Sequence, residues 1–149
     1  MSKGPLILVD TDQVELGGGD VVEPQRVAAS SAGMASTAHY CATNAGNQML
    51  ATGGNAIDAA VAAALALGVC EPAASGIGGQ TMMLIHTAQP RRTFALDGSS
   101  RAPNRATADL LSETKSRLRG HTATTVPSSL AAYDYALREY GTKSFDEVL

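Results

Sequence analysis

The chain has few residues of the kinds that bind metals or act as catalytic bases, and their spacing argues against several common sites. It contains three histidines and two cysteines, namely His39, His86, His121, Cys41 and Cys70. Zinc sites usually combine pairs of cysteine or histidine ligands at short, regular spacings. These five residues show no such spacing, and no Gly-x-Ser-x-Gly serine elbow of the hydrolases is present. We therefore expect no metal site and no serine triad.

A glycine-rich turn, GIGG at residues 76–79, is the only segment that resembles a phosphate-binding loop. Such loops follow a strand and lead into a helix, whose first amides then contact the phosphate. Here the turn follows an apolar helical stretch and precedes a strand-like one, so we expect neither a nucleotide nor another cofactor. The two cysteines fall within apolar helical stretches, where buried and reduced thiols are the expected state.

Composition and charge argue against nucleic acid and membrane surfaces as partners. The 149 residues include 11 Lys and Arg against 14 Asp and Glu, for a net charge of −3 without a basic cluster. Tryptophan is absent and aromatic residues reach only 4%, so the core must rely on close packing of small side chains. The apolar run at residues 5–9 is too short for a signal peptide. We expect a cytoplasmic protein, or a secreted one whose leader has been trimmed.

The most distinctive stretch is GGNAIDAAVAAALALGVCEP, residues 53–72. Asn55 is a strong N-cap, Asp58 completes a capping box, and Pro72 stops the predicted helix. Because residues 56–70 are apolar all round, we expect this helix to be buried on every side, mostly by parts of the protein that lie outside this chain. It would span about 22 Å, too short for a membrane helix.

Further elements flank this helix and give an α+β fold class. An earlier helix is predicted to begin near Ser36 or Thr37 and to end at Gly53-Gly54. Residues 81–86 and 92–96 read as the two strands of a β-hairpin. Residues 1–30 are expected to form a flexible leader, because they are rich in turn and loop signals.

A later helix closes at Gly141 and is followed by the start of another one. Its predicted inner face comprises Leu130, Tyr133, Leu137 and Tyr140. Residues 144–147, SFDE, form a capping box, yet one helical turn cannot support itself. We infer that the natural polypeptide continues, so that residues 31–149 are the first part of a larger domain. Alone, this part would expose apolar faces, and we expect association, including homo-oligomers, or poor solubility.

Several segments together resemble the start of the γ-glutamyltranspeptidase (γ-glutamyltransferase) family. They are GMASTAHYCATNAG (33–46), GGNAIDAAVAAALALGVCEPAASGIGG (53–79), ALDGSSRAP (95–103) and REYGT (138–142). The resemblance implies an N-terminal-nucleophile hydrolase fold, in which two stacked β-sheets lie between helical layers. It also implies a precursor that cuts itself into a large and a small subunit. Residues 31–149 would supply helices and a β-hairpin of the large subunit, with the small subunit as partner.

The chemistry that the resemblance implies is acyl transfer by a threonine freed at a new N-terminus, with its own α-amine as base. Its hydroxyl attacks the γ-amide of glutathione or a related compound, and water or an amine then releases the glutamyl group. In the family this threonine lies far downstream, and no threonine here has a similar context. We therefore expect no catalytic residue in this chain and no activity of the chain alone.

The loop before Ala102-Pro103 is where family members carry an arginine that clamps the substrate α-carboxylate. The matching position here is Ser99, and the nearest arginine, Arg101, follows roughly 7 Å further along an extended loop. Ser99, Ser100 and Arg101 are the substrate-binding candidates, with a solvated Arg101 as the alternative. The acyl donor is then either a γ-glutamyl compound or another amide, such as a glutaryl-type side chain cleaved by an acylase of the same fold. A non-catalytic scaffold is the remaining alternative.

Overall fold

The structure is a computed structural model that describes residues 29–112 and 118–149. Its elements are α1 (Tyr40–Ala51), α2 (Ala56–Cys70), β1 (Thr81–Thr87), β2 (Arg92–Gly98), the 3-10 helix η1 (His121–Ala123), α4 (Ser129–Tyr140) and α5 (Phe145–Val148). The predicted flexible leader lies, except for its last two residues, outside the described residues. None of the described helices has the length and apolar character needed to span a bilayer.

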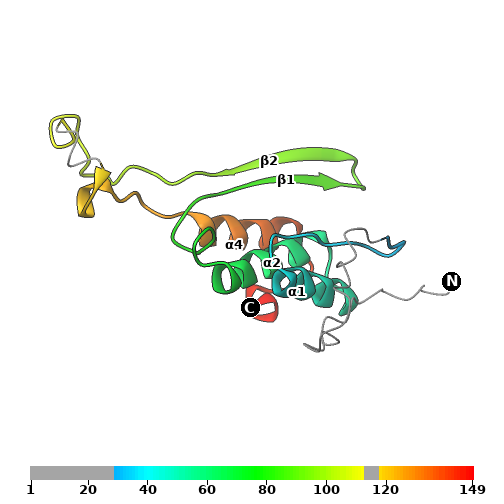
Figure 1. Cartoon of the computed structure of the whole chain (residues 1–149). Helices are drawn as coiled ribbons and strands as arrows, with labels where there is room; N and C mark the ends of the chain where they lie inside the picture. Colours follow the sequence, from blue (N-terminus) through cyan, green and yellow to red (C-terminus); the bar gives the residue numbers. More distant parts are fainter. Residues whose placement is uncertain (1–28, 113–117) are drawn as a thin grey trace, which may run out of the picture.

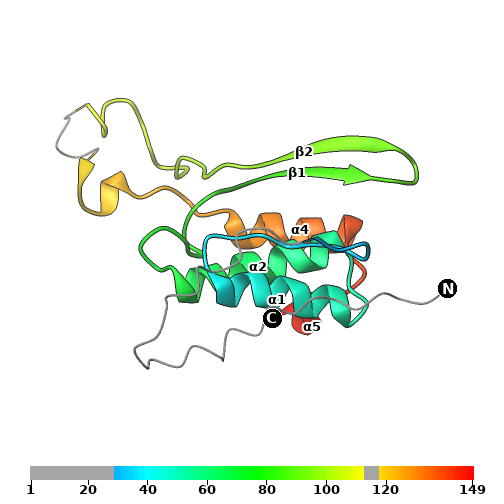
Figure 2. The same cartoon turned by 45° about the vertical axis from the view of Figure 1, so that its right-hand side comes forward.

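The helices form one layer, and the β-hairpin extends across it as a second (Figures 1 and 2). Helix α2 is central, since it contacts α1, α4 and α5, whereas both strands contact α4. The strands are antiparallel, with Thr81 opposite Gly98 and Thr87 opposite Arg92. The predicted hairpin and the α+β class are therefore confirmed, with each strand slightly longer than expected.

Small residues allow the helices to lie close together. A Cβ atom at Gly46 of α1 would lie only 3.0 Å from the Cβ of Ala35 and 3.2 Å from the carbonyl oxygen of Ala59. The buried apolar cluster consists of Val61, Ala62, Tyr133, Leu137 and Val148. The core thus lies between α2, α4 and α5, and it has the small side chains that the composition predicts.

Within this chain α2 is not covered on every side, and its complete enclosure by parts outside the chain stays a prediction. Its first half contains the buried residues Asp58, Ala59 and 61–63. Towards its end the side chains are half-buried or exposed, and Val69 is 81% exposed. The reason is that the hairpin packs against α4, so it leaves the far end of α2 uncovered (Figure 1).

Helix α1 begins later than predicted. Its N-cap is His39, whose Nδ1 accepts a hydrogen bond from the Cys41 N–H at 3.2 Å. Thr37 instead donates its hydroxyl to the His39 carbonyl at 2.7 Å and lies 2.7 Å from the Thr43 hydroxyl. Thr37 thus contacts the start of α1 through its side chain but does not cap the helix. The N-cap is His39, not Ser36 or Thr37.

The inner face of α4 differs from the predicted one only at Leu130. Tyr140 is half-buried and packs on Phe94, with ring centroids 5.2 Å apart. Tyr133 and Leu137 are buried as expected, but Leu130 is 41% exposed. Ala132 and Ala136 are buried as well, and Ala132 lies against Gly98 of β2. The short side chain of Ala132 leaves room for β2, whereas a leucine at that position would not.

The carboxylate of Asp58 joins the start of α2 to the loop after α4. The Asn55 N–H donates to it at 2.6 Å, which completes the predicted capping box. From the loop, Thr142 donates its N–H at 3.0 Å and its hydroxyl at 2.6 Å, and the Lys143 N–H donates at 3.2 Å. The Asn55 side chain adds a 2.7 Å hydrogen bond to the Tyr140 carbonyl. Two segments distant in the sequence are therefore fixed to one buried charge.

These contacts decide the ionisation of Asp58. Burial alone favours the neutral form and raises the pKa. Hydrogen bonds from the Thr142 side chain and from the amides of Asn55, Lys143 and Thr142 outweigh burial, so the pKa of Asp58 is lowered. A carboxyl whose pKa is lower in the folded state stabilises the fold above its unfolded pKa. That contribution is lost as the pH falls through the folded pKa.

We predict that Asp58→Asn lowers the free energy of unfolding at neutral pH by about 2–4 kcal/mol, because three amides and a hydroxyl lose a charged acceptor. The difference from the unmodified protein should shrink below about pH 4, where the unfolded-state carboxyl becomes protonated. Denaturant unfolding followed by circular dichroism between pH 7 and pH 3 measures both effects.

The matched control is Asp134→Asn on α4, which removes an exposed ion pair with Arg138 at 2.9 Å. It should change the free energy of unfolding by less than about 0.5 kcal/mol. Equal stabilities of the two variants at neutral pH would contradict the role of Asp58.

Candidate functional site

The three predicted substrate-binding residues, Ser99, Ser100 and Arg101, directly follow β2 beside the start of α4. Together with the last two residues of β2 they form residues 97–101, which we call the substrate loop. Ser128, the residue before α4, donates its N–H to the Gly79 carbonyl at 3.1 Å and its hydroxyl to the Gly98 carbonyl. The glycine-rich turn, the end of β2 and the first residues of α4 therefore meet at one point. We name this point the α4 junction; its residues are Gly79, Thr81, Gly98, Ser128 and Ser129.

Hydroxyl groups connect the α4 junction to the core. The Thr81 Oγ1 forms hydrogen bonds with the Ser129 Oγ at 3.1 Å and with the Tyr133 hydroxyl at 3.2 Å. Ser129 and Tyr133 are both buried. Because these groups satisfy one another away from solvent, the junction can hold the loop in place but offers no exposed nucleophile.

Within the loop, Asp97 and Ser99 form a local turn. The Asp97 Oδ1 accepts hydrogen bonds from the Ser99 N–H at 3.0 Å and from the Ser99 hydroxyl. The Ser99 side chain, followed by its backbone amide, lowers the pKa of Asp97. The exposed Asp97 is therefore ionised at neutral pH, and the Ser99 hydroxyl is already committed to it.

Arg101 is held in the loop by its backbone. Its N–H donates to the Val126 carbonyl at 3.2 Å, and its carbonyl accepts from the Val126 N–H at 2.8 Å. The residue is exposed, and its guanidinium has no acidic partner within residues 29–112 and 118–149. The loop thus carries Ser99 bound to Asp97, a half-buried Ser100, and an Arg101 that is accessible to an anion.

Sequence reasoning missed Asp97 and Ser128. A signal for Asp97 exists, because an aspartate two residues before a serine is typical of an Asx turn. Ser128 has no comparable signal, since its partners Gly79 and Gly98 lie far away in the sequence.

Two hollows lie near α2. One, of about 320 Å³, is bounded by residues 34–37, Leu50 and the small side chains of α2. The other, of about 580 Å³, lies against the glycine-rich turn, Gln80 and Tyr133, next to the α4 junction. Gly79 of the α4 junction lines the second hollow, whereas none of residues 97–101 lines either of the two.

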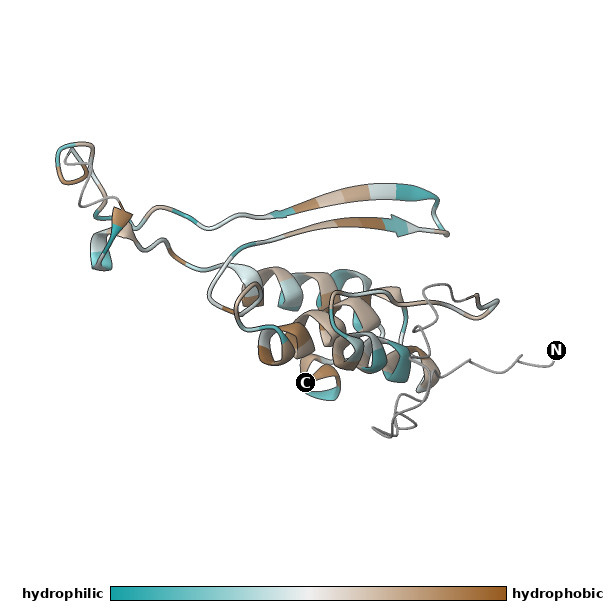
Figure 3. Ribbon diagram, viewed as in Figure 1, coloured by the Kyte–Doolittle hydropathy of each residue, from teal (hydrophilic) through white to brown (hydrophobic). Residues whose placement is uncertain are grey.

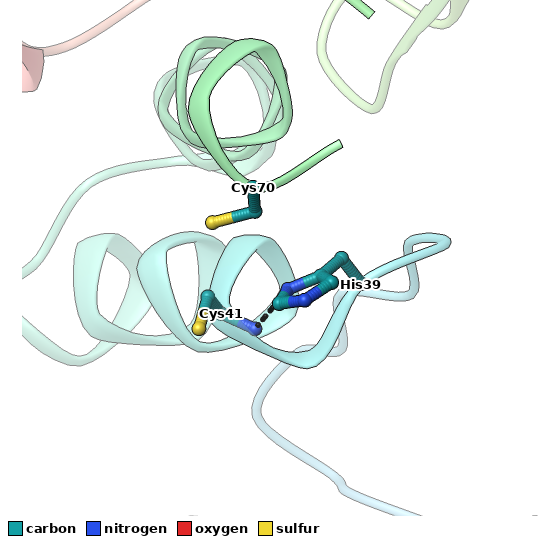
Figure 4. A group of neighbouring side chains, drawn as sticks. All are labelled: His39, Cys41 and Cys70. Atoms are coloured by element: carbon teal, nitrogen blue, oxygen red, sulfur yellow. Dashed lines mark hydrogen bonds between the residues drawn. The ribbon is translucent and has the colours of Figure 1, made fainter. Parts of the chain in front are cut away.

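The described residues contain one group of side chains that could hold a metal ion. His39, Cys41 and Cys70 place their donor atoms within 4.8 Å of one another. They belong to the start of α1 and the end of α2 (Figure 4), not to the elements that form the α4 junction.

The profile of the family described as gamma-glutamyltranspeptidase matches residues 42–149, which include every described helix and strand except the first two residues of α1. The chain belongs to the gamma-glutamyltranspeptidase family.

Curated gamma-glutamyltranspeptidase relatives include both hydrolases and acylases. The glutathione hydrolase proenzyme of Bacillus subtilis (strain 168) is 37% identical over 134 residues, which cover 85% of this chain and 23% of the relative. That of Escherichia coli (strain K12) is 36% identical over 136 residues, covering 87% and 23%. The acylase ACY 1 proenzyme of Pseudomonas sp. (strain V22) is 40% identical over 137 residues, covering 84% and 24%. The chain therefore spans about a quarter of the length of these relatives.

Solved gamma-glutamyltranspeptidase structures share the arrangement of this chain. The Helicobacter pylori gamma-glutamyltranspeptidase has a TM-score of 0.75 at 36% identity, over 82% of this chain and 36% of that one. The cephalosporin acylase of Bacillus halodurans has a TM-score of 0.64 at 35% identity, over 72% and 20%. The expected N-terminal-nucleophile hydrolase fold is confirmed, and this chain supplies helices and a hairpin of it.

The α4 junction yields a prediction about Gly98. A Cβ atom there would lie 2.5 Å from the Thr81 carbonyl oxygen and 2.8 Å from the Ala132 Cβ. Gly98→Ala should therefore lower the free energy of unfolding by about 1–3 kcal/mol, because β1 and α4 must move away from β2 to make room for the methyl group. The control is Gly78→Ala, where no atom lies within 4 Å, and it should change stability by no more than about 0.5 kcal/mol. Thermal unfolding of both variants measures this, and a Gly98→Ala protein as stable as the control would disprove the close approach.

Proposed function

We propose that this chain is the first part of the large subunit of a self-cleaving precursor that hydrolyses or transfers γ-glutamyl groups, as from glutathione. The observation that carries the proposal is the family match over residues 42–149, together with glutathione hydrolase proenzymes among the relatives. The remainder of the precursor, including the small subunit, would be the partner. Cytoplasmic location remains part of the proposal.

The hairpin supports the view that further parts of a precursor cover this chain. On one face of β1, Met82 and Leu84 are 70% and 79% exposed, whereas Ile85 on the other face is buried. Figure 3 shows apolar residues along the middle of both strands. Two strands with an apolar outer face are marginal by themselves, and a second sheet stacked on them would bury that face.

The proposed reaction is acyl transfer to a threonine of a downstream segment. The α-amine of that threonine takes the hydroxyl proton, and the oxygen attacks the γ-carbonyl of the donor. Backbone N–H groups stabilise the oxyanion, the amine leaves, and water or an acceptor amine releases the acyl group. The residues of the present chain contribute no nucleophile, so the chain alone is proposed to be inactive.

The contribution of this chain to the site would be the loop of residues 97–101. The Ser128 hydroxyl binds the Gly98 carbonyl near the start of the loop, and the hydrogen bond between Asp97 and Ser99 shapes the following turn. Arg101 is then the cation available to a substrate carboxylate, in the role that the resemblance assigns to a residue two positions earlier. Ser99 and Ser100 would line the loop beside it.

The second candidate is an acylase that cleaves glutaryl-type or other amides. The acylase ACY 1 proenzyme at 40% identity and the cephalosporin acylase structure favour it. Ser99 at the position of the expected arginine points the same way, because the carboxylate clamp would then be displaced or lost.

The deciding experiment uses the protein expressed from its complete reading frame. Denaturing electrophoresis should show two polypeptides produced by self-cleavage. Release of a chromogenic amine is then compared between γ-glutamyl and glutaryl anilides of the same amine. Preference for the γ-glutamyl anilide supports the proposal, and preference for the glutaryl anilide establishes the acylase. A cleaved protein that releases neither amine would overturn both.

We predict that Arg101→Ala raises KM for the preferred anilide by about 10- to 100-fold with a smaller change in kcat, because it removes a charged hydrogen-bond donor to the carboxylate. Arg105→Ala, which removes an exposed arginine four residues later, should leave both constants within about twofold. An Arg101→Ala enzyme with unchanged KM would show that this arginine is only a solvated loop residue.

A further inference from the structure

Three donor side chains converge where the first turn of α1 meets the last turn of α2. His39 is the N-cap of α1, Cys41 lies in its first turn, and Cys70 is the last residue of α2. One imidazole nitrogen and the two sulfur atoms lie within 4.8 Å of one another. Figure 4 shows Cys70 approaching from α2 towards the part of α1 that carries the other two. We name this group the Cys–His cluster.

The imidazole of the Cys–His cluster is held in a form that can bind a cation. Because the His39 Nδ1 accepts a hydrogen bond from the Cys41 N–H, this nitrogen carries a lone pair and no proton. The ring also stacks on Tyr40, with centroids 4.8 Å apart and planes at 27°. Stacking and capping together limit the rotation of the ring and keep the unprotonated nitrogen beside Cys41.

The two thiols are free, half-buried and close enough to interact across the helices. Two sulfurs and one imidazole nitrogen are the donor set that thiophilic ions prefer, Zn²⁺ foremost among those common in cells.

We propose that His39, Cys41 and Cys70 form a binding site for Zn²⁺ or a similar thiophilic cation, with the fourth position taken by water or another ligand. Zinc bonds of about 2.3 Å to sulfur and about 2.0 Å to nitrogen place these tetrahedral donors about 3.5–3.8 Å apart. The donor atoms, now within 4.8 Å of one another, must therefore close by about 1 Å at their largest separation.

Binding is balanced in charge and protons. Each thiol releases one proton to solvent, so two thiolates neutralise the dication, while the imidazole binds in its neutral form. Coordination through Nδ1 would replace its hydrogen bond to the Cys41 N–H. The ion would then clamp the first turn of α1 to the end of α2, the part of α2 that the other described elements leave least covered.

The site departs from the expectation, drawn from sequence spacing, that the chain has no metal ligands. The spacing gave no signal, because Cys70 lies a whole helix away from Cys41. Only the antiparallel packing of α1 and α2 brings them together. The proposal does not depend on the proposed enzymatic function.

The test uses the protein expressed from its complete reading frame, reduced and freed of metal by a chelator. Titration with Co²⁺ should show one ion bound with sulfur-to-cobalt charge-transfer absorption in the near ultraviolet, and Zn²⁺ should displace it. Cys41→Ser and Cys70→Ser should each abolish that absorption and weaken Zn²⁺ binding at least about 100-fold. Loss of a residue that only supports a metal ligand typically costs about 10- to 100-fold, and loss of a ligand itself should cost at least as much.

Two histidine variants separate the metal site from helix capping. His39→Asn keeps a good N-cap acceptor but removes the imidazole, and it should weaken Zn²⁺ binding at least about 10-fold without loss of helix content. His86→Asn changes a histidine of β1 that pairs with Thr93 at 2.9 Å, and it should leave Zn²⁺ affinity unchanged.

Three results would overturn the proposal. The first is the absence of charge-transfer absorption in the reduced protein at Co²⁺ concentrations that saturate known thiolate sites. The second is unchanged Zn²⁺ affinity in correctly folded Cys41→Ser or Cys70→Ser protein, with folding checked by circular dichroism. The third is a Cys41–Cys70 disulfide in the isolated protein together with no metal binding after reduction.

Discussion

The helical layer depends on one buried negative charge, the carboxylate of Asp58. A carboxylate removed from water is strongly destabilising unless hydrogen bonds replace its hydration. Here Asn55 supplies one amide from the start of α2, and Thr142 and Lys143 supply the other donors from the loop after α4. The charge is satisfied only when the two segments are together, so it specifies their arrangement more sharply than apolar contact alone. Within the described residues no buried side-chain nitrogen or oxygen lacks a partner.

The position of the candidate site follows from that arrangement. With its end fixed to α2, α4 presents Ala132 and Tyr133 to the hairpin and Ser128 to Gly79 and Gly98. The position of residues 97–101 therefore depends, through the α4 junction, on how the helices pack. In this view the chain is a rigid support that places an arginine and a turn, while the reacting groups come from elsewhere in the proposed precursor. The large exposed apolar residues of the hairpin fit such a support.

The features that could be predicted from sequence are those determined by nearby residues. The capping boxes at Asn55 and Ser144, the hairpin and the end of α4 at Gly141 all rest on local signals, and the family resemblance rests on motifs. Features set by distant contacts were missed. Thr37 contacts α1 without capping it, and His39 is the N-cap. Leu130 is exposed, whereas Ala132 is buried against Gly98 of β2. Ser128 and Cys70 likewise gain their partners only through tertiary packing, so no spacing along the chain reveals them.

A double-mutant cycle between Asp58→Asn and Thr142→Val tests the central claim most directly. Thr142→Val removes the hydroxyl that donates to Asp58 at 2.6 Å and keeps the shape of the side chain. If the buried carboxylate joins α2 to the loop after α4, the free energies of unfolding at neutral pH should show a coupling of about 1–3 kcal/mol. Effects that add to within about 0.5 kcal/mol would mean that the two residues act independently, and would contradict the account.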